Sequence, residues 1–134
     1  MIEHDILEIL KNSGDDGSRL NAVVDEFRDG RDVNEILELL DSSNAELVSI
    51  GAWILSELHF KLYESNVFVC RLRELIEHED PGVRFSALSA LYPAMDPLDE
   101  ATHELLNKLR NDPDLGVRIS AEAIAARFIK DRTS

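Results

Sequence analysis

EDPGVRFSALSAL, residues 79–91, recurs in similar form as PDLGVRISAEAIA, residues 113–125, after an offset of 34 residues. Aligned on Val-Arg, both segments place serine two residues after the arginine and alanine directly after that serine. A third copy, ELVSIGAWILSEL at 46–58, is offset by 35 residues on the N-terminal side, with Ser49 in place of the arginine. A fixed period of this length is typical of stacked supersecondary units.

Each copy predicts a pair of helices. The first helix carries two leucines three residues apart: Leu37 and Leu40, Leu72 and Leu75, and Leu106 and Leu109. The second carries valine and alanine four residues apart: Val48 and Ala52, Val83 and Ala87, and Val117 and Ala121. These spacings put each pair on one helical face, and no segment alternates with a strand period for long enough to predict a sheet. The alanines let neighbouring helices approach closely, and each follows a small residue: Gly51, Ser86 and Ser120.

Aspartate and proline mark the expected ends of these helices. Asp80-Pro81 and Asp96-Pro97 each offer an N-cap followed by proline at the first helical position, where its missing N–H costs nothing. Tyr92-Pro93 ends the preceding helix, because the residue before proline avoids the α conformation. The expected fold is therefore all-α.

The segments DPGVRFSALSAL and DLGVRISAEAIA resemble the second helix of HEAT repeats. The resemblance covers residues 32–130 with three copies, and residues 1–31 read as a capping helix pair, so 1–134 is expected to be a single domain. It implies a short α-solenoid of about four stacked helix hairpins. It also implies that Arg84 and Arg118 pair with an acidic group of an adjacent turn, with three candidates: Asp80, Asp112 and Asp114.

The chain is strongly and unevenly acidic, with a formal net charge of −13. Residues 1–66 hold 15 Asp and Glu against 5 Lys and Arg, a net −10, and residues 67–134 hold 12 against 9, a net −3. Such a field repels nucleic acid and anionic membranes and attracts basic partners. The acidic N-terminus does not read as a secretory signal, and one cysteine suits a reducing compartment, so a cytoplasmic location is expected.

A cluster of carboxylates in the N-terminal half is the candidate surface for a basic protein partner, with the single tryptophan as an apolar anchor. The candidate binding residues are Asp15, Asp16, Asp25, Glu26, Asp29, Asp32, Glu35 and Trp53. The alternative is that the carboxylates only form a solvated face and that Trp53 packs between repeats.

No motif predicts catalysis, a cofactor or a metal site. The four histidines are scattered outside HExxH, GDDG at 14–17 is a solvated turn, and Cys70, beside Phe68 and Leu72, is expected to be buried. The HEAT resemblance implies a protein-binding module. A softer resemblance of ELVSIGAWILSEL to small bacterial HEAT-like proteins favours an immunity protein that neutralises a basic toxin. The alternative is a general adaptor or assembly factor, including one that accompanies a lyase. The oligomeric state is left open.

Overall fold

The computed structural model describes residues 2–11, 16–58 and 66–133. These three segments form eight α-helices and one short 3-10 helix, and they contain no strand. The helices are α1 (Ile2–Lys11), α2 (Asp16–Arg28), α3 (Glu35–Leu40), α4 (Ala45–Glu57), α6 (Asn66–Leu75), α7 (Pro81–Leu91), η1 (Tyr92–Ala94), α8 (Glu100–Leu109) and α9 (Leu115–Thr133). The expected all-α class is confirmed.

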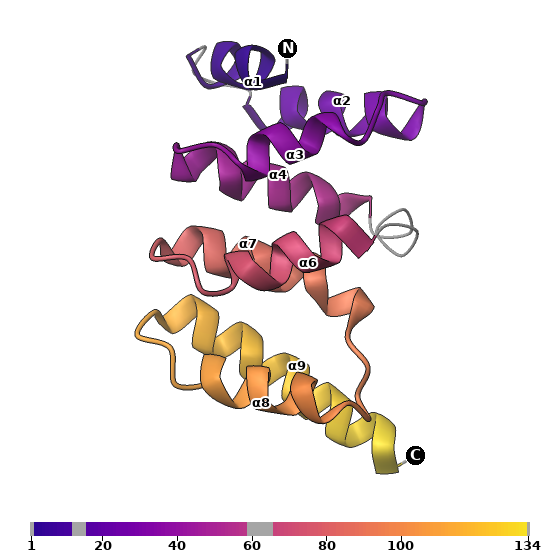
Figure 1. The fold of residues 1–134 in the computed structure, drawn as a ribbon, viewed down its shortest axis with the longest axis vertical. Coiled ribbons are helices and arrows are strands. Elements are labelled where there is room, and N and C mark those ends of the chain that lie inside the picture. The colour runs from indigo at the N-terminus through magenta and orange to yellow at the C-terminus, as the bar shows by residue number, and fades with distance from the viewer. Residues whose placement is uncertain (1, 12–15, 59–65, 134) are drawn as a thin grey trace.

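Consecutive helices pack against each other in pairs, and the pairs follow one another along the longest axis of the molecule (Figure 1). The pairs α3–α4, α6–α7 and α8–α9 each turn back on themselves, and the N- and C-termini lie at opposite ends. The second helices also pack across pairs, α4 on α7 and α7 on α9, with α4 and α7 in the most extensive contact. No helix in the described part of the chain has the length and apolar content needed to cross a bilayer.

The valine–alanine pairs of the second helices lie in the core, as the spacing predicts. Their six side chains are at most 1% exposed: Val48, Ala52, Val83, Ala87, Val117 and Ala121. The small residues beside the alanines have a structural reason as well. A Cβ built on Gly51 would lie 2.8 Å from the Cβ of Leu39, so glycine lets α3 and α4 approach closely.

The register expected for the first helix of the first copy is wrong by one residue. Ile36, Leu39 and Leu40 are buried on α3, whereas Leu37 is only partly buried. These three match the buried Leu72, Leu75 and Ile76 of α6 at an offset of 36, not 35. The buried positions of α3 and α4 therefore lie one residue farther apart along the chain than those of α6 and α7, and a single offset for both helices of the pair was the error.

The N-caps agree with the sequence at one site and differ at another. Asp80 caps α7 by accepting hydrogen bonds from the backbone N–H groups of Gly82 and Val83. The expected cap at Asp96 is wrong: α8 begins at Glu100, and Asp99 accepts from the N–H of Ala101. Asp96 instead accepts a hydrogen bond from the backbone N–H of Leu98, in the turn that precedes α8.

Arg84 and Arg118, 34 residues apart, donate hydrogen bonds to equivalent backbone carbonyls of the turns that precede their helices. Nη1 of Arg84 donates to the carbonyls of His78 and Glu79, and Nη1 of Arg118 donates to the equivalent carbonyls of Asp112 and Pro113. Arg84 also forms two parallel hydrogen bonds of 2.9 Å to the buried carboxylate of Asp112 in the next helix pair. The expected pairing is confirmed for Arg84, which binds Asp112. Arg118 donates to backbone carbonyls and forms no ion pair within the described segments. Asp80 and Asp114 act as helix caps instead.

In the first copy, Ser49 occupies the position of the arginine and makes different contacts. The hydroxyl of Ser49 lies 2.8 Å from the hydroxyl of Ser86 on α7 and donates to the carbonyl of Gly82 at 3.3 Å. These contacts cross from α4 to α7 and need only short side chains. The close packing of these two helices therefore rests on small residues on both sides.

Candidate functional site

The described acidic candidates lie at the N-terminal end of the molecule, on α2, on α3 and on the connection between them. Asp25 and Glu26 are exposed on α2, and Asp29 and Asp32 are exposed in the connection. Glu35 is the first residue of α3 and is partly buried. The sequence grouping therefore corresponds to a single region, at the upper right of Figure 1.

An arginine that the sequence analysis overlooked lies at the centre of this region. Arg31 donates to carboxylates from three helices or their ends: Asp5 at 3.1 Å, Glu26 at 2.8 Å and Glu35 at 2.9 and 3.1 Å. Its guanidinium also lies 5.2 Å from the ring centroid of Phe27. The side chain is only 18% exposed, which strengthens these charge-assisted contacts.

These contacts change the protonation equilibria of both partners. Hydrogen bonding to Glu35 raises the pKa of Arg31 above its ordinary value, despite partial burial that acts in the opposite direction. The same hydrogen bond from Arg31 lowers the pKa of Glu35. Both groups therefore stay charged near neutral pH, and Glu26 and Glu35 are held in a structural network.

The remaining described carboxylates differ in whether they have a cation partner. Asp25 pairs with Arg28 at 2.9 Å. Asp29 and Asp32 have no cation partner in the described part of the chain, although one Asp32 oxygen accepts from the N–H of Asn34. We call Asp29 and Asp32 the acidic turn. Among the predicted binding residues whose side chains are described, these two carboxylates have no cation partner.

Three other candidates are placed less directly. Asp15 lies outside the described residues, and Asp16 begins α2 with a side chain that is also outside them. Trp53 lies on α4, partly buried and packed against the core. Its repeat equivalents are the fully buried Leu88 and the exposed Glu122, so the tryptophan is intermediate between a core residue and a surface residue.

The second helices carry apolar side chains at one equivalent position of the repeat. Ile50 is partly buried on α4, Phe85 is 44% exposed on α7, and Ile119 is 56% exposed on α9. All three come two residues after the valine that the three copies share. The match of Phe85 with Ile119 in the repeat was the sequence pattern that could have identified this position. We call these residues the apolar row.

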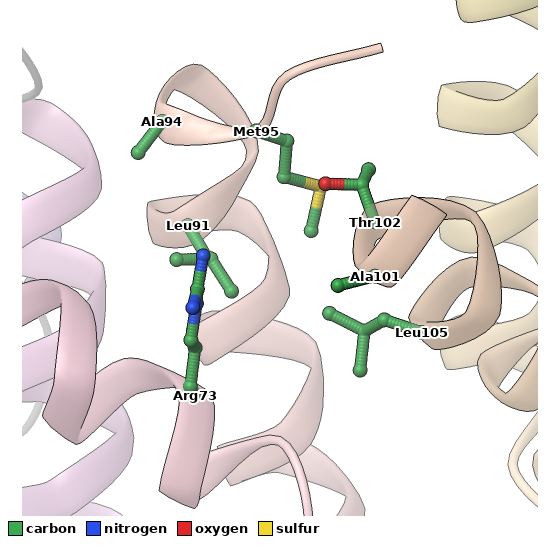
Figure 2. A pocket seen from close by; sticks show the side chains of 7 residues that line it. All are labelled: Arg73, Leu91, Ala94, Met95, Ala101, Thr102 and Leu105. Atoms are coloured by element: carbon green, nitrogen blue, oxygen red, sulfur yellow. The ribbon is translucent and has the colours of Figure 1, made fainter. Parts of the chain in front are cut away.

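A cavity of about 170 Å³ lies between α6, η1 and α8. Figure 2 shows Arg73 extending from α6 toward Leu91, with Ala94 and Met95 at one end and three residues of α8 on the opposite side. Those three are Ala101, Thr102 and Leu105. The lining is mostly apolar, and its two polar side chains are Arg73 and Thr102.

The expectation of a buried cysteine is wrong, because Cys70 is a free, exposed thiol on α6. Phe68 and Leu72 are buried on one face, and a residue two positions from each is rotated by about 200° to the other face. Within the described segments, no group of three or more His, Cys, Asp or Glu side chains could hold a metal ion.

Comparisons of the chain with protein-family models, with curated proteins and with solved structures find no match. The chemistry of the acidic turn, the apolar row and the cavity is therefore the basis for assigning a function.

Proposed function

We propose that this chain is a short HEAT-like α-solenoid that binds a basic protein, and more specifically an immunity protein that neutralises a basic bacterial toxin in the cytoplasm. The observation that carries the proposal is the acidic turn. Asp29 and Asp32 stay exposed and unpaired with any described cation, although Arg28 and Arg31 neutralise their neighbours.

The repeated contacts support the solenoid part of the proposal. Arg84 and Arg118 make the same carbonyl contacts one repeat apart, and Val-Ala pairs are buried in all three copies. Each helix pair alone buries too little apolar surface to be stable, and it gains a core by stacking on the next pair. Such stacks present broad side-chain surfaces to other macromolecules.

Charge and apolar contact have separate roles in the proposed interface. The acidic turn lies in the half of the chain that carries a net −10, so it attracts a basic protein and accelerates its association. The apolar row, with Phe85 and Ile119, offers partly exposed side chains that lose contact with water when a partner covers them. Affinity at high salt would then come from the apolar row.

The test begins with a tagged pull-down from the native cell lysate, followed by binding measurements with the purified partner. The change is Asp29→Lys combined with Asp32→Lys. We expect the dissociation constant to rise more than tenfold at low salt, with a slower association rate, because an attractive charge pair becomes repulsive.

The matched control is Glu100→Lys combined with Glu104→Lys, which makes the same charge change on exposed residues of α8. Equal weakening by both double variants would mean that only net charge matters and would contradict the acidic turn as the site. A captured partner that is toxic when expressed alone and harmless with this chain would support the immunity assignment. Capture of a non-toxic housekeeping protein would contradict it and favour the adaptor alternative.

A further inference from the structure

The cavity between α6, η1 and α8 has the composition of a small-molecule site. It measures about 170 Å³, and five of its seven lining residues are apolar: Leu91, Ala94, Met95, Ala101 and Leu105. An engineered apolar cavity of about 150 Å³ is large enough to bind benzene. This cavity therefore has room for an apolar body of roughly six carbon atoms.

The cavity follows from how the helix pairs stack. The second helices α7 and α9 pack closely, whereas α6 and α8 are not among the closely packed pairs. Two small residues, Ala94 on η1 and Ala101 on α8, line the space between α6 and α8 and do not fill it. Apolar side chains beside an unfilled space lack contact partners, so an apolar ligand would gain those contacts.

The two polar side chains of the lining point to a carboxylate. Arg71 is paired with Asp41 and Glu74, but Arg73, two residues later, has no carboxylate partner among the residues described. A guanidinium binds a carboxylate through two parallel hydrogen bonds. Thr102 is only 6% exposed, and its hydroxyl has no hydrogen-bond partner in the described structure, so it is available as a second donor.

We infer that this cavity binds a small apolar carboxylate, with the chain of the ligand among Leu91, Met95 and Leu105 and its carboxylate on Arg73. Arg73, without a carboxylate partner among the described residues, places a positive charge beside an apolar cavity in a molecule whose net charge is −13. Anion selectivity at this position therefore has to come from the site, because the overall field favours cations. This site is separate from the acidic turn, and its assignment does not depend on the protein-binding function.

The probe is hexanoate, compared with 1-hexanol and hexylamine by NMR titration of the full chain, following the side-chain methyl groups of Met95, Ala101 and Leu105. We expect saturable shifts of these methyls with hexanoate and a dissociation constant on the order of a millimolar for a ligand of this size. Hexanol should bind at least tenfold more weakly. Hexylamine should bind more weakly still.

Two variants and one control separate the parts of the site. Arg73→Gln should weaken hexanoate binding about tenfold and leave hexanol unchanged, and Ala101→Phe should abolish binding by filling the cavity. Arg127→Gln removes the same charge from an exposed position on α9 and should have no effect. Equal binding of all three probes, equal loss in Arg73→Gln and Arg127→Gln, or shifts located away from these methyls would overturn the inference.

Discussion

Arg31 shows how a single side chain determines what an acidic sequence can do. In the sequence alone, Glu26 and Glu35 belong to one acidic cluster that looks available to a partner. In the structure the arginine binds Asp5, Glu26 and Glu35 and lies over Phe27, so it ties α1, α2 and α3 together. Part of the predicted binding surface is therefore a structural contact, and among the candidates whose side chains the structure describes, Asp29 and Asp32 are the carboxylates without a cation partner.

Replacing Arg31 by alanine should lower the free energy of unfolding by about 2 kcal/mol, because a partly buried guanidinium that holds three carboxylates is lost. Urea denaturation at neutral pH measures the change. Arg31→Lys should recover less than half of the loss, since an ammonium lacks the planar fork of donors. The control Arg19→Ala removes an exposed arginine of α2 and should change the stability by less than about 0.5 kcal/mol. An equal effect of the two alanine variants would contradict the role of Arg31.

At the scale of the element, the close approach of helices depends on residues with small side chains or none. Gly51 allows α3 to lie against α4, and Ser49 and Ser86 join α4 to α7 by a contact of 2.8 Å. The repeat alignment identified the positions of Gly51 and Ser86 as small and placed Ser49 where the other two copies have arginine. The alignment did not show which helix each residue faces. Gly51 faces α3, the first helix of its own pair, whereas Ser86 faces α4, the second helix of the preceding pair.

Gly51→Ala should destabilise the protein by about 1 kcal/mol, even though alanine favours helices over glycine by about the same amount. The new Cβ would lie 2.8 Å from the Cβ of Leu39, which moves only if the helix moves. Thermal and urea unfolding measure the difference. Gly116→Ala is the matched helical control, because its Cβ would meet only a carboxylate oxygen of Asp114 at 3.1 Å and Phe85 at 4.0 Å. We expect no loss there, and a stabilised Gly51→Ala variant would show that α3 is not held against α4 in this way.

At the scale of the whole molecule, ion pairs join successive helix pairs. Arg71 of α6 reaches back to Asp41, Lys108 of α8 reaches back to Glu77, and Arg84 reaches forward to Asp112. Burial alone would raise the pKa of Asp112, but hydrogen bonds from Arg84 and from the N–H of Asp114 outweigh it and lower the pKa. The hydrogen bond from Lys108 lowers the pKa of Glu77 as well.

Stability should therefore fall in acid. A carboxyl whose pKa is lower in the folded state contributes its full stabilisation above its unfolded pKa of about 4, and loses it as pH falls through the folded pKa. We expect a nearly constant free energy of unfolding from about pH 7 to 5 and a decline below about pH 4. Asp112→Asn should be less stable at pH 7 and should show a shallower decline in acid. Asp29→Asn, at an exposed carboxylate with no cation partner among the described residues, is the control. An identical acid slope in Asp112→Asn and wild type would contradict the role of Asp112.

The sequence by itself determined the helical class, the period of the repeat and the burial of its Val-Ala pairs, because each depends on spacing within one helix. The resemblance to HEAT repeats also predicted acidic partners for Arg84 and Arg118, and the structure gives one to Arg84, in Asp112. Only the tertiary structure decided which carboxylates are free, since Arg31 meets Asp5 across 26 residues of chain. It alone also showed the register of α3, the exposed side of Cys70 and the cavity beside Arg73. Those features depend on turn lengths and on distances between helices, which the spacing of residues within a helix does not determine.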